Sequence, residues 1–194
     1  MVGLTLSAEL FDRELRHYRI PARRLWENTL ACALAMESLA QFIGVDPRSA
    51  YTTGLMRSVG KLVLNRLAAE ESRLPYSGAN GVPLTAWERV AWGCDNAAVA
   101  GFLLEQWNFS GETVEAIRRH YEPETAFADA APTAYLLHFA AGIAEDLGHG
   151  LPGEAGLWAG RAEKMSAAGL CEAEYALCRE ETGAAFEQVR HVLV

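Results

Sequence analysis

The longest apolar stripe of the chain lies between residues 22 and 43. Hydrophobic side chains recur there at steps of three and four, as at Leu25, Ala35 and Leu39, which is the spacing of one helix face. Gly44 follows, and glycine is the residue that most readily ends a helix. Because the stripe is wide, we expect most of this helix to be buried. Strand-like alternation is almost absent elsewhere, so the pattern predicts an all-α fold.

Capping residues predict where further helices begin. Asp46 precedes Pro47, which is typical of an N-cap followed by proline in the first turn. Thr85 and Glu88 have the spacing of a capping box, in which each side chain accepts from the other residue's backbone N–H at the start of a helix. Gly60 predicts a break between two short helices. The first expected helix runs from after Ser7 to before Pro21. Further helices are expected over residues 22–43, 47–56, 61–71, 95–107, 110–120 and 133–147, and another begins near Thr85 and ends at Gly93. Residues 154–194 should form two or three more, the last from about Glu172.

Turn-forming residues separate these segments. Glycine, proline and asparagine crowd residues 72–83, which we expect to be a loop and a candidate hinge. A linker over 123–132 and a break at 148–153 are expected for the same reason. The five tryptophans, Trp26, Trp87, Trp92, Trp107 and Trp158, fall on predicted helices and are interpreted as core residues.

One apolar segment contains a cation. The sequence GLMRSVGKLVL, residues 54–64, has the pattern of a buried helix that ends in a turn, yet Arg57 and Ser58 stand in its middle. No acidic residue lies nearby in sequence to pair with the guanidinium. A buried guanidinium needs a hydrogen-bonding partner, so this position calls for an explanation.

Composition limits the classes of function. The chain has 194 residues, 51% of them hydrophobic, which suits one domain with a substantial core. Its net charge of −8 would repel a nucleic acid backbone on average. No signal peptide is recognisable, and no apolar run approaches the roughly 20 residues that cross a bilayer. We therefore expect a cytoplasmic protein that binds neither nucleic acid nor membrane.

Generic motifs for catalysis are missing. The four cysteines do not form a zinc-binding pattern, and no two of the five histidines stand three or four residues apart. The chain lacks a G-x-S-x-G nucleophile frame and a glycine-rich phosphate loop. These observations indicate a soluble helical domain in which no sequence motif points to a particular reaction or cofactor.

Four consecutive blocks resemble the HDOD domain, a helical relative of the HD phosphohydrolases. They read LWENTLACALAMESLA, DPRSAYTTGLMRSVGKLVL, WERVAWGCDNAAVAGFLLEQWNFSGETVEAIRRHY and AYLLHFAAGIAEDLG. The resemblance covers about residues 22–150 and continues more weakly toward residue 194. It implies an HD-domain-like helical bundle.

The resemblance also implies that most metal ligands have been replaced. In HD hydrolases a G-L-L-H-D-I-G-K segment supplies adjacent His and Asp ligands, and here Arg57 and Ser58 stand in those places. Only His120, in I-x-x-H-Y, matches a family ligand histidine. The positions matched to the family's metal pocket are Asn28, Arg57, Ser58, Asp95, Asn96, His120 and Ala141.

A catalytic metal takes three or more well-placed ligands and keeps one position open to water, so one histidine does not suffice. We expect no metal and no hydrolase activity. For Arg57 two interpretations stand side by side. In one, its charge replaces the metal and meets an acid such as Asp95 or Glu88, or a bound anion. In the other, the side chain extends to solvent.

The resemblance implies three candidate functions. The first is a non-catalytic bacterial output or adaptor domain in signal transduction, such as the effector part of a two-component response regulator. The second is a sensor that binds a nucleotide or another anion through Arg57, His120 and the two asparagines of the former metal pocket. The third is a residual metal-dependent phosphohydrolase.

The expected partner is a protein or a fused regulatory domain of the receiver, GGDEF or EAL type, and a homodimer is also considered. HDOD domains usually carry a longer helical region before the first block, so the chain is interpreted as a fragment of a longer signalling protein. A naturally shortened domain is the alternative.

Overall fold

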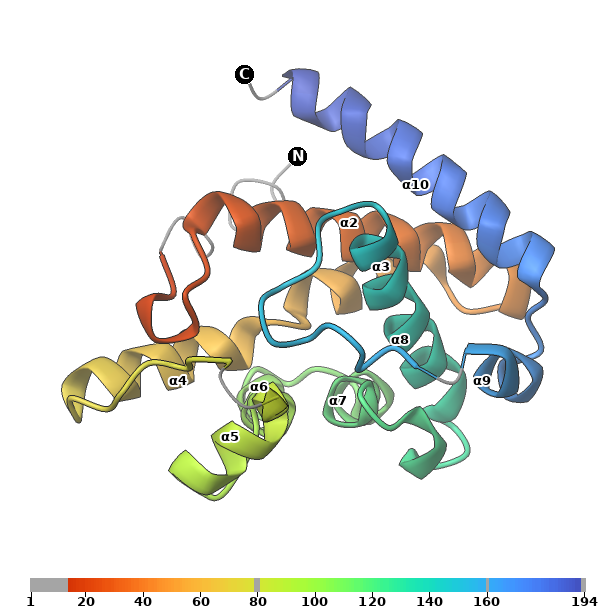
Figure 1. Cartoon of the computed structure of the whole chain (residues 1–194). Coiled ribbons are helices and arrows are strands. Elements are labelled where there is room, and N and C mark those ends of the chain that lie inside the picture. The colour runs from red at the N-terminus through yellow and green to blue at the C-terminus, as the bar shows by residue number, and fades with distance from the viewer. Residues whose placement is uncertain (1–13, 79–80, 160, 193–194) are drawn as a thin grey trace.

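Helix α2 (Ala22–Ile43) forms the centre of the molecule (Figure 1). The computed structural model describes residues 14–78, 81–159 and 161–192. As the apolar stripe predicts, α2 is buried along most of its length, and Gly44 ends it in the left-handed conformation with φ 73°. It packs against α3, α8 and α10. A Cβ on Gly54 of α3 would lie 2.6 Å from the Cα of Ala33, so glycine there permits the close approach of α3 to α2.

Helices α3 (Pro47–Met56) and α4 (Val59–Glu70) are separated by a turn at Arg57 and Ser58. Asp46 caps α3 as predicted, since its carboxylate accepts a hydrogen bond of 2.8 Å from the backbone N–H of Ser49. The predicted break at Gly60 is wrong by two or three residues. Gly60 lies inside α4 instead, where it packs against the backbone of α6.

Helices α5 (Leu84–Trp92), α6 (Asn96–Gln106) and α7 (Gly111–Arg119) form the lower side of the molecule in Figure 1. Asp95 caps α6 and Ser110 caps α7, as the sequence predicts. The capping box at Thr85 is a wrong prediction. Pro83 precedes the first turn of α5, and the Glu88 side chain points into the interior instead of capping its own helix.

The C-terminal part contains η3 (Pro123–Thr125), α8 (Ala131–Asp146), α9 (Arg161–Ala168) and α10 (Glu172–Val192). Residues 147–159 lead from α8 toward α9 and cross the front of the molecule between α2 and α7 (Figure 1). Glu154 and Trp158 were expected on helices, but both lie in the turns of this connection. The segment from residue 72 to 83 is a loop as predicted, apart from residues 79–80, which are outside the described residues.

The predicted first helix is not found in the part of its range that is described. The 3-10 helix η1 (Arg16–Tyr18) lies there, flanked by an isolated β-bridge between Leu15 and Ile20. The expected start after Ser7 lies outside the described residues. Burial of Tyr18 and its neighbours explains the compact turn, because they pack against Leu64 and Leu84 of α4 and α5.

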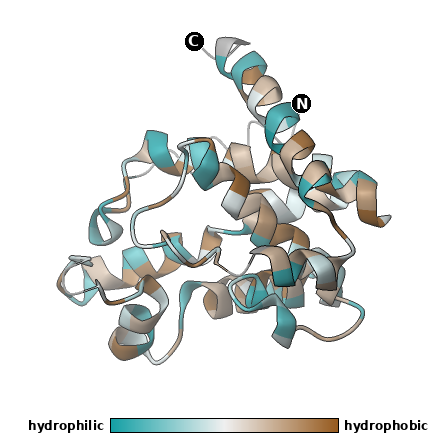
Figure 2. Ribbon diagram, turned by 45° about the vertical axis from the view of Figure 1, so that its right-hand side comes forward, coloured by the Kyte–Doolittle hydropathy of each residue, from teal (hydrophilic) through white to brown (hydrophobic). Residues whose placement is uncertain are grey.

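Across the described ranges, regular structure is helical, which confirms the predicted all-α fold. Figure 2 shows hydrophobic and hydrophilic residues alternating around the outer helices, as expected where one face of each helix packs inward. The main core joins residues of α2, α6, α7, α8 and α10, among them Leu39, Leu104 and Phe139. No helix in the described residues is both long enough and apolar enough to span a membrane.

Candidate functional site

Arg57 lies in the molecular interior, with only 1% of its surface exposed. Its Nη1 group donates to both carboxylate oxygens of Glu154, at 3.1 and 3.0 Å, and its Nη2 group donates to Oδ1 of Asn28 at 2.6 Å. The side chain therefore does not extend to solvent. The partners that were expected from sequence, Asp95 and Glu88, bond elsewhere.

Lys61 stands one turn later on α4 and is fully buried. Its Nζ group lies 2.7 Å from Oε1 of Glu154 and donates to Oδ1 of Asn96 at 2.9 Å and to the hydroxyl of Tyr121 at 3.1 Å. The Tyr121 hydroxyl in turn donates to Oε1 of Glu154 at 2.8 Å. One carboxylate thus pairs with two cations, one from α4 and one from the turn before it. We call Arg57, Lys61 and Glu154 the ion cluster.

Glu88 supplies a second buried carboxylate beside the ion cluster. Its Oε1 accepts from the hydroxyl of Tyr18 at 2.7 Å, and its Oε2 accepts from the backbone and side-chain amides of Asn96, both at 2.9 Å. Asn96 therefore bridges Glu88 to Lys61. The formal charges of two cations and two carboxylates balance, which is what burial of this many ionisable groups requires.

The remaining residues of the expected pocket have separate surroundings. Nδ1 of His120 donates to the carbonyl of Ile117 at 2.7 Å, while its Nε2 atom is buried with no hydrogen bond among the described residues. Asp95 caps α6 and pairs with Arg89 at 2.7 Å. Ser58 is buried without a hydrogen bond to its hydroxyl from the described residues, and Ala141 belongs to an apolar cluster.

Trp158 covers the ion cluster from the connection between α8 and α9. Its ring stacks on Tyr121 at 5.6 Å between centroids and lies 5.6 Å from Cζ of Arg57. The same connection contributes Glu154, and the carbonyl of its His149 accepts from Nδ2 of Asn28 at 2.9 Å. This segment therefore covers one side of the site with the carboxylate of Glu154, the ring of Trp158 and the carbonyl of His149.

The electrostatic environment fixes the ionisation of the central acid. Burial alone would raise the pKa of Glu154, but Arg57 and Lys61 outweigh it and hold the pKa at about 2. Burial also opposes the charge of Arg57, and Glu154 more than offsets this so that the pKa of Arg57 is raised. Burial and the nearby Arg57 charge hold the pKa of His120 well below its usual value, so His120 is neutral.

This arrangement does not fit a divalent metal ion. Among the described residues, no group of three or more His, Cys, Asp or Glu side chains is placed to hold one. Two cations occupy the centre of the site, and each would repel a divalent ion by several kcal/mol at roughly 4 Å and moderate dielectric. Glu154, the acid at this centre, already accepts hydrogen bonds from both of them.

Sequence reasoning did not find Lys61, Glu154, Tyr121 or Trp158. Lys61 carried a signal, because a lysine inside the apolar run Val59–Leu64 is unusual without a partner. Glu154 carried none, since it lies on a turn 97 residues from Arg57. Tyr121 directly follows His120 and was noted only as part of the family motif.

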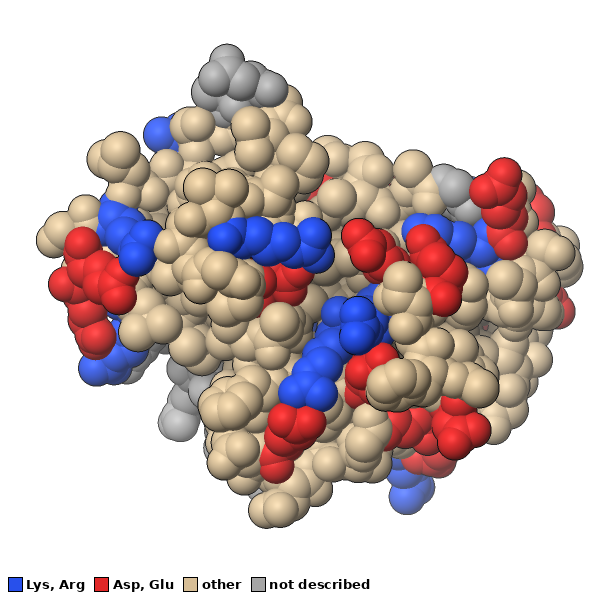
Figure 3. All heavy atoms as spheres, turned by 90° about the horizontal axis from the view of Figure 1, so that it is seen from below, with Lys and Arg blue, Asp and Glu red and all other residues tan. Residues whose placement is uncertain are grey.

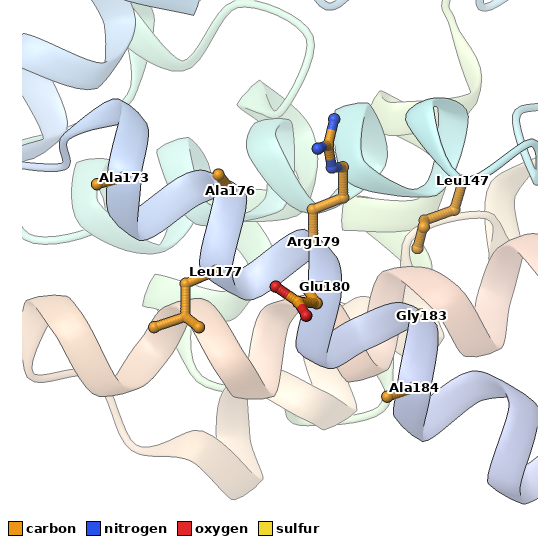
Figure 4. Close-up of a pocket in the computed structure, with 8 residues that line it drawn as sticks. All are labelled: Leu147, Ala173, Ala176, Leu177, Arg179, Glu180, Gly183 and Ala184. Carbon is orange, nitrogen blue, oxygen red and sulfur yellow. The ribbon is translucent and has the colours of Figure 1, made fainter.

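Two surface depressions lie outside the ion cluster. One, of about 710 Å³, follows α10 and the end of α8, with Leu147, Leu177 and Ala184 in its wall (Figure 4). It contains no group of the ion cluster. The other, of about 170 Å³, lies outside Tyr121 and is lined by three arginines, Arg89, Arg118 and Arg119, among other residues.

The model of the HDOD domain family matches residues 2–123, which is more than half of the chain. The chain belongs to the HDOD family. Comparison with curated proteins gave no significant match. The family match begins earlier and ends earlier than the range of about 22–150 that sequence motifs suggested.

Solved structures share the fold. A protein named as a phosphohydrolase from Shewanella amazonensis SB2B superposes with a TM-score of 0.61 at 22% identity, covering 84% of this HDOD chain and 62% of that protein. The response regulator MmoQ from Methylococcus capsulatus strain Bath gives a TM-score of 0.57 at 26% identity, covering 81% of this chain and 60% of its own. The HDOD chain thus spans less than two thirds of these structures.

Proposed function

We propose that this HDOD chain is a non-catalytic output domain of a signalling protein, which transmits the state of a partner through contacts of its helices. The ion cluster carries the proposal. Arg57 stands where the HD hydrolases have a ligand histidine, and both Arg57 and Lys61 pair with the chain's own Glu154. The interior is therefore held together by protein charges where the enzymes would use a metal.

The likeness to a response regulator supports the signalling part of the proposal. MmoQ is 26% identical over 81% of this chain, and the match covers 60% of MmoQ. We infer that the partner is a regulatory domain, of the receiver, GGDEF or EAL type, on the same chain or on another. A cytoplasmic location and a single HDOD-type domain are part of the same proposal.

Catalysis is tested directly with purified protein loaded with Mg²⁺, Mn²⁺ or Fe²⁺. Cyclic dinucleotides, nucleotides and phosphate monoesters are offered as substrates, and bound metal is measured by elemental analysis. We expect no turnover above that of the His120→Gln variant and far less than one metal ion per chain. Turnover that His120→Gln or Asn96→Ala abolishes would overturn the proposal.

A sensor function at the former metal pocket is a second candidate. Nε2 of His120 and Oγ of Ser58 are buried and have no hydrogen bond among the described residues, so a small ligand with complementary groups would satisfy them. An anion that pairs with Arg57 would have to displace Glu154 from it. Thermal-shift measurements with nucleotides and cyclic dinucleotides test this, because a ligand of the folded state raises the melting temperature. A shift that His120→Gln removes would support the sensor, and no shift across the panel would count against it.

A further inference from the structure

A small polar pocket lies on the face formed by α5, α6 and α7, outside the buried ion cluster. Its volume is about 170 Å³, and Figure 3 shows this face, where basic and acidic side chains lie side by side near the centre. Three arginines line it, Arg89 from α5 and Arg118 and Arg119 from the end of α7. The remaining lining residues are Asp95, Ala98, Tyr121, Glu122 and Thr125.

The position of Arg118 is built into the packing of α6 against α7. Its side chain crosses α6 at Gly101, where a Cβ would lie 2.5 Å from Nε and 2.9 Å from Cδ of Arg118. Beyond this crossing, Arg118 reaches Glu105 with an N–O distance of 2.8 Å. A side chain at residue 101 would therefore require Arg118 to move from this path across the helix.

Two of the three arginines, Arg89 and Arg119, keep terminal donors for a ligand, whereas both terminal amino groups of Arg118 bond to Glu105. Arg119 donates from Nε to Glu115 at 3.1 Å, and Arg89 donates from Nε and Nη2 to Asp95 at 3.0 and 2.7 Å. Both terminal amino groups of Arg119 and Nη1 of Arg89 have no hydrogen bond to the described residues. The pairs are partly exposed to water, where such pairs contribute little and exchange readily.

We propose that this pocket binds a phosphate group, as inorganic phosphate or as the phosphoryl group of a small monoester. Arginine presents planar pairs of donors that match phosphate oxygens, and several arginines converge here. The lining has three positive and two negative side chains, in a chain whose net charge is −8. The pocket is smaller than those that enclose a whole drug-sized ligand, so it suits a phosphate group whose ester substituent extends into solvent.

The pocket contacts the ion cluster through two residues. Tyr121 lines it, and the hydroxyl of Tyr121 is bonded to Glu154 and Lys61. Asp95, the partner of Arg89, caps α6 and directly precedes Asn96, which binds Lys61. A phosphate that draws Arg89 away from Asp95 would therefore alter the cap of α6 next to Asn96, which joins α6 to Lys61 of α4. Binding itself does not depend on the proposed output function.

The test is a titration of isotope-labelled protein with inorganic phosphate, followed by NMR at constant ionic strength with chloride as the reference anion. We expect saturable shifts at the start of α6 and the end of α7. Arg119→Gln should weaken binding about tenfold or more, as expected for loss of a charge-assisted contact. Arg66→Gln is the matched control, because Arg66 is also an exposed arginine paired with a glutamate, at 3.0 Å from Glu70, and lies on α4 away from the pocket.

Titration with O-phosphoserine and with serine separates the two forms of the ligand. Binding of phosphoserine with the same dependence on Arg119 assigns the pocket to monoesters, and binding of inorganic phosphate alone assigns it to the free anion. The inference would be overturned if neither inorganic phosphate nor phosphoserine gave saturable shifts. Equal affinity of the wild type and Arg119→Gln for the ligand would also overturn it. Hydrolytic activity of the chain would contradict the proposal of a non-catalytic output domain, but it would not affect this binding result.

Discussion

The guanidinium of Arg57 and the carboxylate of Glu154 meet at 3.0 Å in the interior, although 97 residues separate them in the chain. Both residues lie in turns, Arg57 between α3 and α4 and Glu154 between α8 and α9. Their side chains are each only 1% exposed. The contact therefore fixes the connection at residues 147–159 to the middle of the fold, and its contribution to the free energy of unfolding can be measured.

Replacing Glu154 by glutamine should be strongly destabilising. The amide keeps the shape of the side chain but removes the carboxylate that pairs directly with both Arg57 and Lys61, and leaves Glu88 as the remaining buried acid near the two cations. Removing one partner of a buried ion pair typically costs about 3–5 kcal/mol. Urea unfolding followed by circular dichroism would measure this loss.

Glu70→Gln is the matched control for that measurement. Glu70 also pairs with an arginine at 3.0 Å, but 57% of its side chain is exposed. Its substitution should change the free energy of unfolding by at most about 1 kcal/mol. Equal effects of the two substitutions would show that the ion cluster is not a buried, coupled unit.

Arg57→Met should destabilise the wild-type protein but stabilise the Glu154→Gln variant. In the wild type it removes a counter-charge and the donor to Asn28, and leaves Glu154 paired with Lys61, so it should destabilise the fold. In the Glu154→Gln background it removes an unpaired buried cation and should restore roughly 1–3 kcal/mol, within the range seen when buried ion pairs are replaced by apolar groups. A double-mutant cycle checks this, and additive effects would contradict it.

The partner of Arg57 shows how far sequence reasoning reached at this site. Helical spacing and capping residues placed α2, α3, α6 and α7 correctly because these signals act within a few residues. The need of Arg57 for an acid also followed from burial alone. The identity of that acid did not, because Glu154 comes from a turn whose position depends on how α8 and α9 pack.

Glu88 illustrates the opposite failure. Its spacing from Thr85 is that of a capping box, yet tertiary hydrogen bonds to Tyr18 and Asn96 take both carboxylate oxygens. Burial of Glu88 gives these long-range bonds more weight than a local cap at the surface would have. A local pattern was therefore overridden by a contact across 70 residues of sequence.

Stability should fall on mild acidification because of a buried histidine. Burial lowers the pKa of His138 from 6.5 to about 4, with the neighbouring Lys164 acting in the same direction and His120 and Glu124 opposing it. Between these values the unfolded chain takes up a proton that the folded protein does not, so stability is present above pH 6.5 and is lost as pH falls toward 4. The full loss, reached near pH 4, is on the order of 3 kcal/mol, of which about 2 kcal/mol is reached at pH 5. Urea unfolding of wild type and His138→Gln at pH 7 and pH 5 measures it, and the variant should show a smaller drop.

Glu154 adds a second, more acidic transition. Its folded pKa of about 2 lies below its ordinary value of 4.5, because Arg57 and Lys61 outweigh the effect of burial. A depressed carboxyl pKa contributes stability above pH 4.5, and that contribution is lost as pH falls from 4.5 toward 2. The Glu154→Gln variant lacks a group that titrates there, so its stability should depend less on pH across this range. Parallel pH profiles of the two proteins would contradict the assignment.

Gly60 should tolerate no side chain, because α4 and α6 pack through it. A Cβ there would overlap the backbone carbonyl oxygen of Asn96 and lie 2.8 Å from the backbone nitrogen of Ala100. Backbone atoms inside a helix cannot yield cheaply, so Gly60→Ala should cost about 3 kcal/mol or more despite alanine's better helix propensity. Gly111→Ala at the first turn of α7 is the control, since nothing lies within 4 Å of a Cβ there, and it should be neutral or stabilise by up to about 1 kcal/mol. Because Asn96 also binds Lys61, Gly60→Ala should in addition change the NMR signals of the Asn96 side-chain amide. A variant with wild-type stability and unchanged signals would show that α4 and α6 do not pack this closely.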